Sequence, residues 1–182
     1  MALNKDKALK IIINCAKIYN EELKDNNFKI FYIKDSEQKS VEIQFRDTNF
    51  KHLTGVETKI PAKMFYEACI SNKLSVNDFK IDNKGNVQRK LNVLPALNSL
   101  FTGACQIGPY DERFGIKLRS DYMVGKNYIC VGFKKQERKD FPITLLSEDI
   151  RKQTHPTYKV IKIMKKKYFE KEYSECVYVS KN

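Results

Sequence analysis

Apolar side chains recur at helical spacing along residues 4–24, and this pattern predicts an amphipathic helix with one face in the core. A second helix is predicted over 61–73, where Pro61 suits the first turn. The helical pattern of residues 86–101 contains Pro95, which predicts a kink or a split into two pieces. The expected core face of the first helix carries Ala8, Leu9, Ile12, Cys15, Ala16, Tyr19 and Leu23.

Alternating apolar and polar positions predict strands before and after the central helices. The segments "NNFKIFYIKD" and "SVEIQFRD" flank a short polar linker and suit a hairpin. After Thr102 and Gly103, short segments rich in β-branched and aromatic residues predict an antiparallel sheet of four or five strands. The segment "FPITLLSEDIRKQTHP" is expected to interrupt that sheet as a loop or short helix. The fold predicted for residues 1–182 is a single α+β domain, with N-terminal and central helices packed on a small, mainly antiparallel β-sheet of four to six strands.

The composition, 42% hydrophobic and 31% charged, is that of an ordinary globular protein. No apolar run approaches the roughly 18 residues that cross a bilayer, so no membrane partner is expected. The five cysteines are scattered without a CxxC pair, which favours buried thiols in a reducing compartment and no metal site. A P-loop and a GxGxxG motif are both absent from the sequence, so no nucleotide cofactor is expected. The expected location is the cytoplasm of a bacterial host cell.

A net charge of +12 is the strongest compositional signal, and it favours nucleic acid as the partner, either RNA or duplex DNA. Residues 151–171 hold eight Lys and Arg against one acid, Glu170. A solvated lysine-rich surface is the alternative. Strict alternation along "YKVIKIMKKK" predicts Lys159, Lys165 and Lys167 on one face of a strand and Lys162 and Lys166 on the other. The candidate nucleic-acid-binding residues are Lys159, Lys162, Lys165, Lys166, Lys167, Arg151 and Lys152.

Metal-independent RNA cleavage is the chemistry that the sequence best accommodates. It needs a base for the 2′-hydroxyl proton, an acid for the departing 5′-oxygen, and a cation beside the phosphate. His52 suits the base or the acid, because its ordinary pKa lies near neutrality. Lys51 or Arg46 would supply positive charge, and Thr54 would hydrogen-bond a phosphate. The alternative places His52 in a turn, between a strand and a helix, where it only caps backbone groups.

The segments "FKHLTGV", "AKMFYEACI" and "KLSVNDF" resemble the fourth class of phage Barnase–EndoU–colicin–RelE-like nuclease domains. Later segments, "LNVLPALNSLF", "DYMVGKNYICVGF" and "FPITLL", are similar in order and spacing. The resemblance implies a nuclease-like core over 51–182 behind an N-terminal helix and hairpin in 1–50. It also implies carriage on phages or mobile elements and a ribonuclease activity. By position, His52 and Thr54 match the histidine and hydroxyl residue of the family's turn.

The second acid–base group stays open in the sequence, with Lys117, Arg119, Tyr128 and His155 as candidates. Activity itself stays open as well, because a fold does not fix a function. A non-catalytic counter-defence protein, an anti-CRISPR that binds a CRISPR effector nuclease and duplex DNA, is the main alternative. A DNA-binding accessory protein of a mobile element is the third.

Overall fold

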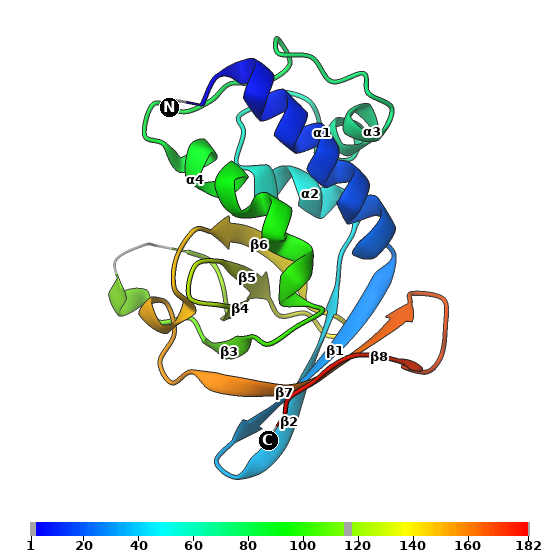
Figure 1. Cartoon of the computed structure of the whole chain (residues 1–182), viewed down its shortest axis with the longest axis vertical. Helices are drawn as coiled ribbons and strands as arrows, with labels where there is room; N and C mark the ends of the chain where they lie inside the picture. The colour runs from blue at the N-terminus through cyan, green and yellow to red at the C-terminus, as the bar shows by residue number, and fades with distance from the viewer. Residues whose placement is uncertain (1–2, 115–117, 182) are drawn as a thin grey trace.

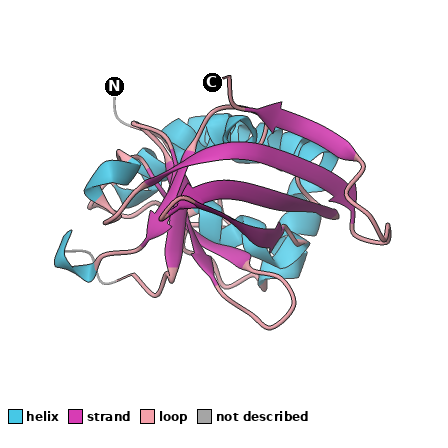
Figure 2. Ribbon diagram, turned by 90° about the horizontal axis from the view of Figure 1, so that it is seen from below, coloured by secondary structure: helices cyan, strands magenta, loops and turns pink. Residues whose placement is uncertain are grey.

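The computed structural model describes residues 3–114 and 118–181 and shows helices gathered over one end of a curled sheet (Figure 1). The view from below shows the long strands crossing in front of the helices (Figure 2). The α-helices are α1 (Lys5–Glu22), α2 (Asp47–Thr54), α3 (Ala62–Ile70) and α4 (Asn86–Val93). Short 3-10 helices are η1 (Leu94–Leu100), η2 (Glu112–Phe114) and η3 (Ile150–Lys152).

Eight strands form one sheet within the described residues, in the order β2-β1-β7-β3-β4-β5-β6, with β8 also paired to β7. All of these strand pairs are antiparallel. The long strand β7 pairs with β1 along one edge and with β3 and then β8 along the other. The strands are β1 (Asn26–Lys34), β2 (Glu37–Gln44), β3 (Gln106–Pro109), β4 (Tyr122–Gly125), β5 (Cys130–Lys134), β6 (Phe141–Leu146), β7 (Tyr158–Lys167) and β8 (Glu175–Val179).

Asp140 joins the two outer strands of this sheet and curls it. The Asp140 amide donates to the Glu42 carbonyl at 2.9 Å, and the Asp140 carbonyl accepts from the Gln44 amide at 2.9 Å. Its buried carboxylate accepts from the Tyr122 hydroxyl at 2.8 Å and from the Gln136 amide at 3.1 Å. Strand β2 therefore meets the start of β6, and the concave side of the sheet encloses apolar side chains.

Buried aromatic rings connect the helices to the sheet. Tyr19 of α1 packs on Phe50 of α2 with ring centroids 5.1 Å apart, and Phe45 packs on Phe101 at 5.0 Å. All four side chains are almost fully buried. Truncating one such ring to alanine costs about 3–5 kcal/mol of stability, so this cluster is a major stabilising contact.

Several sequence predictions are confirmed by these elements. Helix α1 buries the predicted face except for Leu9, which is half-buried. The helical region of residues 86–101 splits into α4 and η1 immediately before Pro95. The hairpin of β1 and β2 forms as expected. The α+β class is confirmed, but the sheet has more strands than the four to six predicted.

The extra strand after Gly103 is "FPITLL", which we expected to be a loop or short helix. It forms β6 at one edge of the strand order. Pro142 is accommodated there because an edge strand has a side that needs no backbone donor, and the pairing with β5 shifts register between Gly132 and Phe133. The prediction is wrong because a strand that contains proline depends on an edge position, and edge position is set by the whole sheet.

Candidate functional site

His52 lies in the last turn of helix α2, so the prediction that it sits on a turn between a strand and a helix is wrong. The helix begins where the Asn49 side chain accepts from the Arg46 amide at 2.9 Å. It ends at Gly55, whose φ of 74° is left-handed and therefore favours glycine. The helix packs on α3 and β6. The imidazole of His52 is exposed.

Thr54 and Arg46, which we expected near the phosphate, occupy different surroundings from His52. Thr54 is fully buried, and its hydroxyl donates to the Lys51 carbonyl at 2.7 Å, so it contributes to the end of the helix. Arg46 precedes the helix at its opposite end, where its guanidinium donates to the Gln44 side chain at 3.1 Å. Within the predicted set, the structure therefore leaves Lys51 as the neighbour of His52.

Two lysine ammonium groups lie at the C-terminal end of α2. Lys51 Nζ donates to the carbonyls of Thr58 at 3.1 Å and Ile60 at 2.8 Å. Lys90 Nζ, from α4, donates to the His52 carbonyl at 3.1 Å and to the Thr144 hydroxyl at 3.4 Å. No carboxylate of the described residues lies within ion-pair distance of either ammonium. Lys90 thus satisfies a carbonyl in the last turn of α2, and Lys51 satisfies two carbonyls of the α2–α3 connection. Both ammonium groups retain a charge without an ion-pair partner in the described part of the chain.

These charges act on His52. Partial shielding from water, followed by the positive charges of Lys51 and Lys90, lowers the pKa of His52 below its ordinary value of 6.5. Burial also lowers the pKa of Lys90. The imidazole is consequently neutral near pH 7, the form in which it accepts a proton.

Lys90 also lines a surface cleft of about 400 Å³ between α4 and β6. Arg89 is exposed beside it and makes no ion pair within the described part of the chain. Glu148 brings a carboxylate to the same cleft. The remaining lining residues are Gly55, Asn86, Leu118, Thr144, Leu145, Leu146 and Ser147. The cleft therefore combines two cations with hydroxyl and carboxylate groups.

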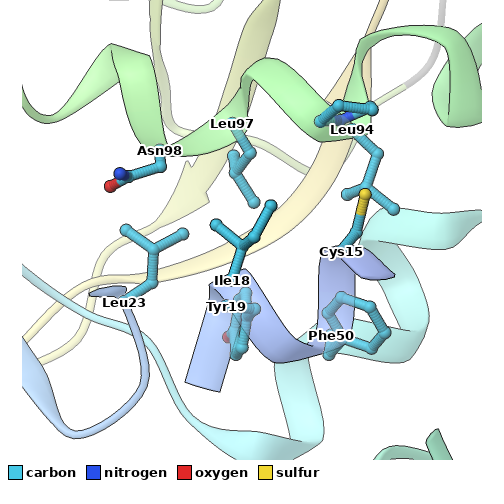
Figure 3. A pocket seen from close by; sticks show the side chains of 9 residues that line it. Cys15, Ile18, Tyr19, Leu23, Phe50, Leu94, Leu97 and Asn98 are labelled. Atoms are coloured by element: carbon cyan, nitrogen blue, oxygen red, sulfur yellow. The ribbon is translucent and has the colours of Figure 1, made fainter. Parts of the chain in front are cut away.

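A second hollow, between α1, α2 and η1, is apolar and too small for a substrate. Figure 3 shows Cys15, Leu94 and Leu97 facing one another across it. Its volume of about 10 Å³ matches a single water molecule at most. We place the candidate site at the α4–β6 cleft because Lys90 lines it and donates to the His52 backbone carbonyl, although His52 itself is not among the lining residues.

The lysines of β7 are oriented by a β-bulge. Phe31 of β1 pairs with Lys162, whereas the next residue, Tyr32, pairs with Val160, so Ile161 is skipped. A bulge inserts one residue and reverses the alternation of faces. As a result, both Val160 before it and Ile163 after it are fully buried.

The bulge gives the lysines an arrangement that strict alternation did not predict. Lys159, Lys162 and Lys166 share the outer face of the sheet, away from the helices. Lys165 lies on the Ile163 side, with its side chain only 14% exposed and its ammonium 3.9 Å from both Glu22 and Glu175. The predicted grouping of Lys159 with Lys165 is therefore wrong.

Arg151 and Lys152 lie on η3, which packs beside β4 rather than on the strand that carries the lysines. The Arg151 guanidinium is paired with the Asp149 carboxylate, at 2.6 Å for the shortest contact. Lys167 is exposed at the end of β7. The seven predicted binding residues thus do not form one patch.

Among the candidates for a second acid–base group, Arg119, Tyr128 and His155 are exposed on loops. Lys117 lies outside the described residues.

No three or more His, Cys, Asp or Glu side chains come together as a metal-binding group in residues 3–114 and 118–181. No helix in those same ranges is long and apolar enough to cross a membrane.

Comparison with protein families gives one match. The model of the family described as phage-Barnase-EndoU-ColicinE5/D-RelE like nuclease4 matches residues 11–182. The chain belongs to this family. The match starts well before the segments that carried the resemblance, so it includes most of α1 and the whole β1–β2 hairpin. Comparison with curated proteins and with solved structures finds no match.

Sequence reasoning missed the residues that surround His52 in space. Lys90 is 38 positions away from His52 along the chain. Its sequence surroundings give no sign that its ammonium group reaches His52. The one local signal was "LTG", because a glycine after a short apolar-periodic segment indicates a helix end. Such an end exposes carbonyls that attract lysines, but the sequence does not say which lysine reaches them.

Proposed function

We propose that this nuclease-family protein binds RNA and cleaves it without a metal ion at the α4–β6 cleft, with His52 as the acid–base residue. One observation carries the proposal: Lys90 Nζ donates to the His52 backbone carbonyl and to the Thr144 hydroxyl, with no carboxylate partner among the described residues. A partly buried charge without a counter-charge destabilises a fold, so such a group marks a candidate anion site.

The phosphate of the scissile bond would lie against Lys90 and Arg89 in the cleft. Lys90 is fixed by its two hydrogen bonds, so little reorganisation is needed when charge develops on the phosphate. His52, neutral near pH 7, would remove the 2′-hydroxyl proton, and its lowered pKa favours this base role over an acid role. The 2′-oxygen would then form a bond to phosphorus as the bond from phosphorus to the 5′-oxygen breaks, and the departing 5′-oxygen would take its proton from water. The buried Thr54 has no part in this proposal.

The experiment is a cleavage assay on labelled RNA with the wild-type protein and His52→Ala. We expect the substitution to lower the cleavage rate by about 10²–10⁴-fold, the usual worth of one acid–base group. Cleavage by the wild type should persist in EDTA, and DNA of the same sequence, which has no 2′-hydroxyl, should remain intact. Lys63→Met, on the exposed face of α3, is the control and should retain activity.

The alternative of a non-catalytic counter-defence protein gives the opposite result in the same assay. Such a protein would bind a CRISPR effector nuclease and duplex DNA with its lysines and would leave RNA uncut. If purified wild-type protein cuts no RNA and His52→Ala still blocks a CRISPR nuclease, the ribonuclease proposal is rejected in favour of the inhibitor.

A further inference from the structure

The connection between β7 and β8 carries two aromatic rings that contribute nothing to the core. Tyr168 is 58% exposed and Phe169 is 73% exposed, and the two rings meet edge to face with centroids 5.7 Å apart. In Figure 1 this connection, coloured orange to red, projects from the side of the molecule. A full burial of such a ring stabilises a protein by about 1.5–3 kcal/mol, and here that free energy is left available for a partner.

The backbone around these rings is ordered by its own hydrogen bonds. The Tyr168 amide donates to the Asp25 carbonyl at 2.9 Å, and the Glu170 amide donates to the Lys167 carbonyl at 3.1 Å. The Glu170 carboxylate accepts from the Lys167 amide at 2.8 Å. The rings are therefore presented on a defined turn, which lowers the entropic cost of binding through them.

Lysines gather around a third ring in the same connection. Lys166 Nζ lies 4.7 Å from the centroid of Tyr173, with Lys139 at 5.6 Å and Lys29 at 6.0 Å. These three lysines and Tyr173, together with Glu42, are called the lysine–tyrosine cluster below. They come from β1, β7, β2, the β7–β8 connection and the segment before β6, so the curled sheet brings together positions far apart in sequence.

Glu42 is the only acid in the lysine–tyrosine cluster. It accepts from the Lys139 ammonium at 3.0 Å and from the Tyr173 hydroxyl at 3.0 Å. Burial raises the pKa of Glu42, but these hydrogen bonds outweigh burial and the pKa is lowered. One carboxylate thus neutralises one of three ammonium groups, and the cluster retains positive charge beside the exposed rings.

We propose that the β7–β8 hairpin binds single-stranded nucleic acid: Tyr168 and Phe169 stack on unpaired bases, and the lysine–tyrosine cluster holds the adjoining phosphates. The inference rests on the proposed function and adds the form of the substrate. Single strands are bound by aromatic rings on which bases stack, next to cations that follow the backbone. In a duplex the base faces are already stacked, so these two rings would have no comparable partner.

The test measures fluorescence anisotropy with a labelled DNA single strand of about 12 nucleotides, within the usual range of site sizes. DNA is chosen because it lacks the 2′-hydroxyl and stays intact during the measurement. The wild type should bind the single strand more tightly than the same sequence as a duplex. Replacing both rings, Tyr168→Ala with Phe169→Ala, should weaken single-strand binding by about 30-fold or more, because each of the two base stacks is worth about 5- to 150-fold.

Two control variants make the result specific. The exchange Tyr168→Phe with Phe169→Tyr keeps both rings and should keep the affinity. Tyr128→Ala removes an exposed ring of the β4–β5 connection, 46% exposed, and should leave binding unchanged. All variants should melt at the wild-type temperature because the altered rings are outside the core.

Unchanged single-strand binding by the double alanine variant overturns the inference and leaves nucleic-acid binding intact. Equal affinity for single strand and duplex overturns it as well. A wild type that binds no nucleic acid rejects the proposed function together with this inference. Ring-dependent binding to vesicles of anionic phospholipid, with no ring dependence for DNA, assigns the hairpin to a lipid surface and also overturns the inference.

Discussion

The cations beside His52 and the cations of the lysine–tyrosine cluster are held in different ways. Lys51 donates to carbonyls of the α2–α3 connection, and Lys90 donates to the His52 carbonyl at the end of α2. Neither ammonium has a carboxylate of the described residues within ion-pair distance. Lys29 and Lys139 share Glu42, at 3.4 Å and 3.0 Å, and lie over an aromatic ring. Lys51 and Lys90 are therefore fixed in position by hydrogen bonds. The lysines of the lysine–tyrosine cluster form a surface patch whose positive charge is partly neutralised by Glu42.

Under the proposed function, the two arrangements of cations suit two different contacts with phosphate. A fixed ammonium stabilises charge that develops at one point, and a misplacement of about 1 Å there can reduce a rate about 100-fold. A surface group of lysines attracts a polyanion over a longer range, and each contact is weak and screened by salt. We therefore expect substitutions at the cleft to change rate and substitutions at the hairpin to change affinity.

The largest effect expected in this comparison is that of Lys90→Met on RNA cleavage. Methionine preserves much of the aliphatic stem that packs against Gly55 but removes the charge. The cleavage rate should fall by about 10²–10³-fold, as when one preorganised donor is removed from a transition state. Single-turnover kinetics at saturating RNA measure this rate separately from binding.

Lys63→Met, on the exposed face of α3, is the matched control and should cleave at the wild-type rate. A Lys90→Met variant that cleaves normally would remove the distinction between the two regions, because the cleft would then contain no catalytic charge.

The lysines of β7 are expected to have a smaller effect, on the salt dependence of nucleic-acid binding. The effect depends on which face of the sheet each lysine occupies. Lys162→Gln with Lys166→Gln should reduce the salt dependence of single-strand binding by about 0.7 in the logarithmic slope for each phosphate that is no longer neutralised. Lys165→Gln should leave the slope unchanged, because Lys165 is mostly buried between Glu22 and Glu175. Anisotropy titrations over a series of salt concentrations give the slopes.

Lys166→Gln alone removes the same single charge as Lys165→Gln from the neighbouring position, so these two single variants separate the effect of position from that of net charge. Equal slopes for the two variants would show that only the total charge matters, and the assignment of the outer face would be abandoned.

The sequence predicted the elements whose signals are local and missed those that depend on partners. The face of α1 and the break before Pro95 follow from periodicity and from proline sterics. Strand β6 was missed because Pro142 is tolerated only at an edge, and edge position is a property of the whole sheet. Helix α2 was missed because it is short and only Phe50 and Leu53 mark its apolar face.

The candidate site was predicted only in part for the same reason. His52 was singled out by residue type and by family resemblance, but Lys90 reaches it through the packing of α4 on α2. The faces of the β7 lysines required the bulge at Ile161, and one inserted residue reverses every side chain that follows. Periodicity alone contains no information about where a bulge falls.

The smallest effect concerns the titration of His52, which nuclear magnetic resonance of its imidazole protons can follow. In the wild type its pKa should lie below 6.5, because shielding from water and the charges of Lys51 and Lys90 all disfavour the protonated ring. Lys90→Met removes one of these charges, so the pKa should rise part of the way back, with shielding and Lys51 still acting. The Lys63→Met control should leave it unmoved.

The same lowered pKa has a defined consequence for stability. Between the lowered folded value and the unfolded value near 6.5, the unfolded state binds more protons than the folded state. The contribution of His52 to stability is therefore complete above pH 6.5 and is lost as the pH falls through the folded pKa. In denaturant titrations, the stability difference between wild type and His52→Gln should be constant above pH 6.5 and should change as the pH falls from 6.5 to the folded pKa of His52. A His52 pKa that is the same in wild type and Lys90→Met would separate His52 from the cleft.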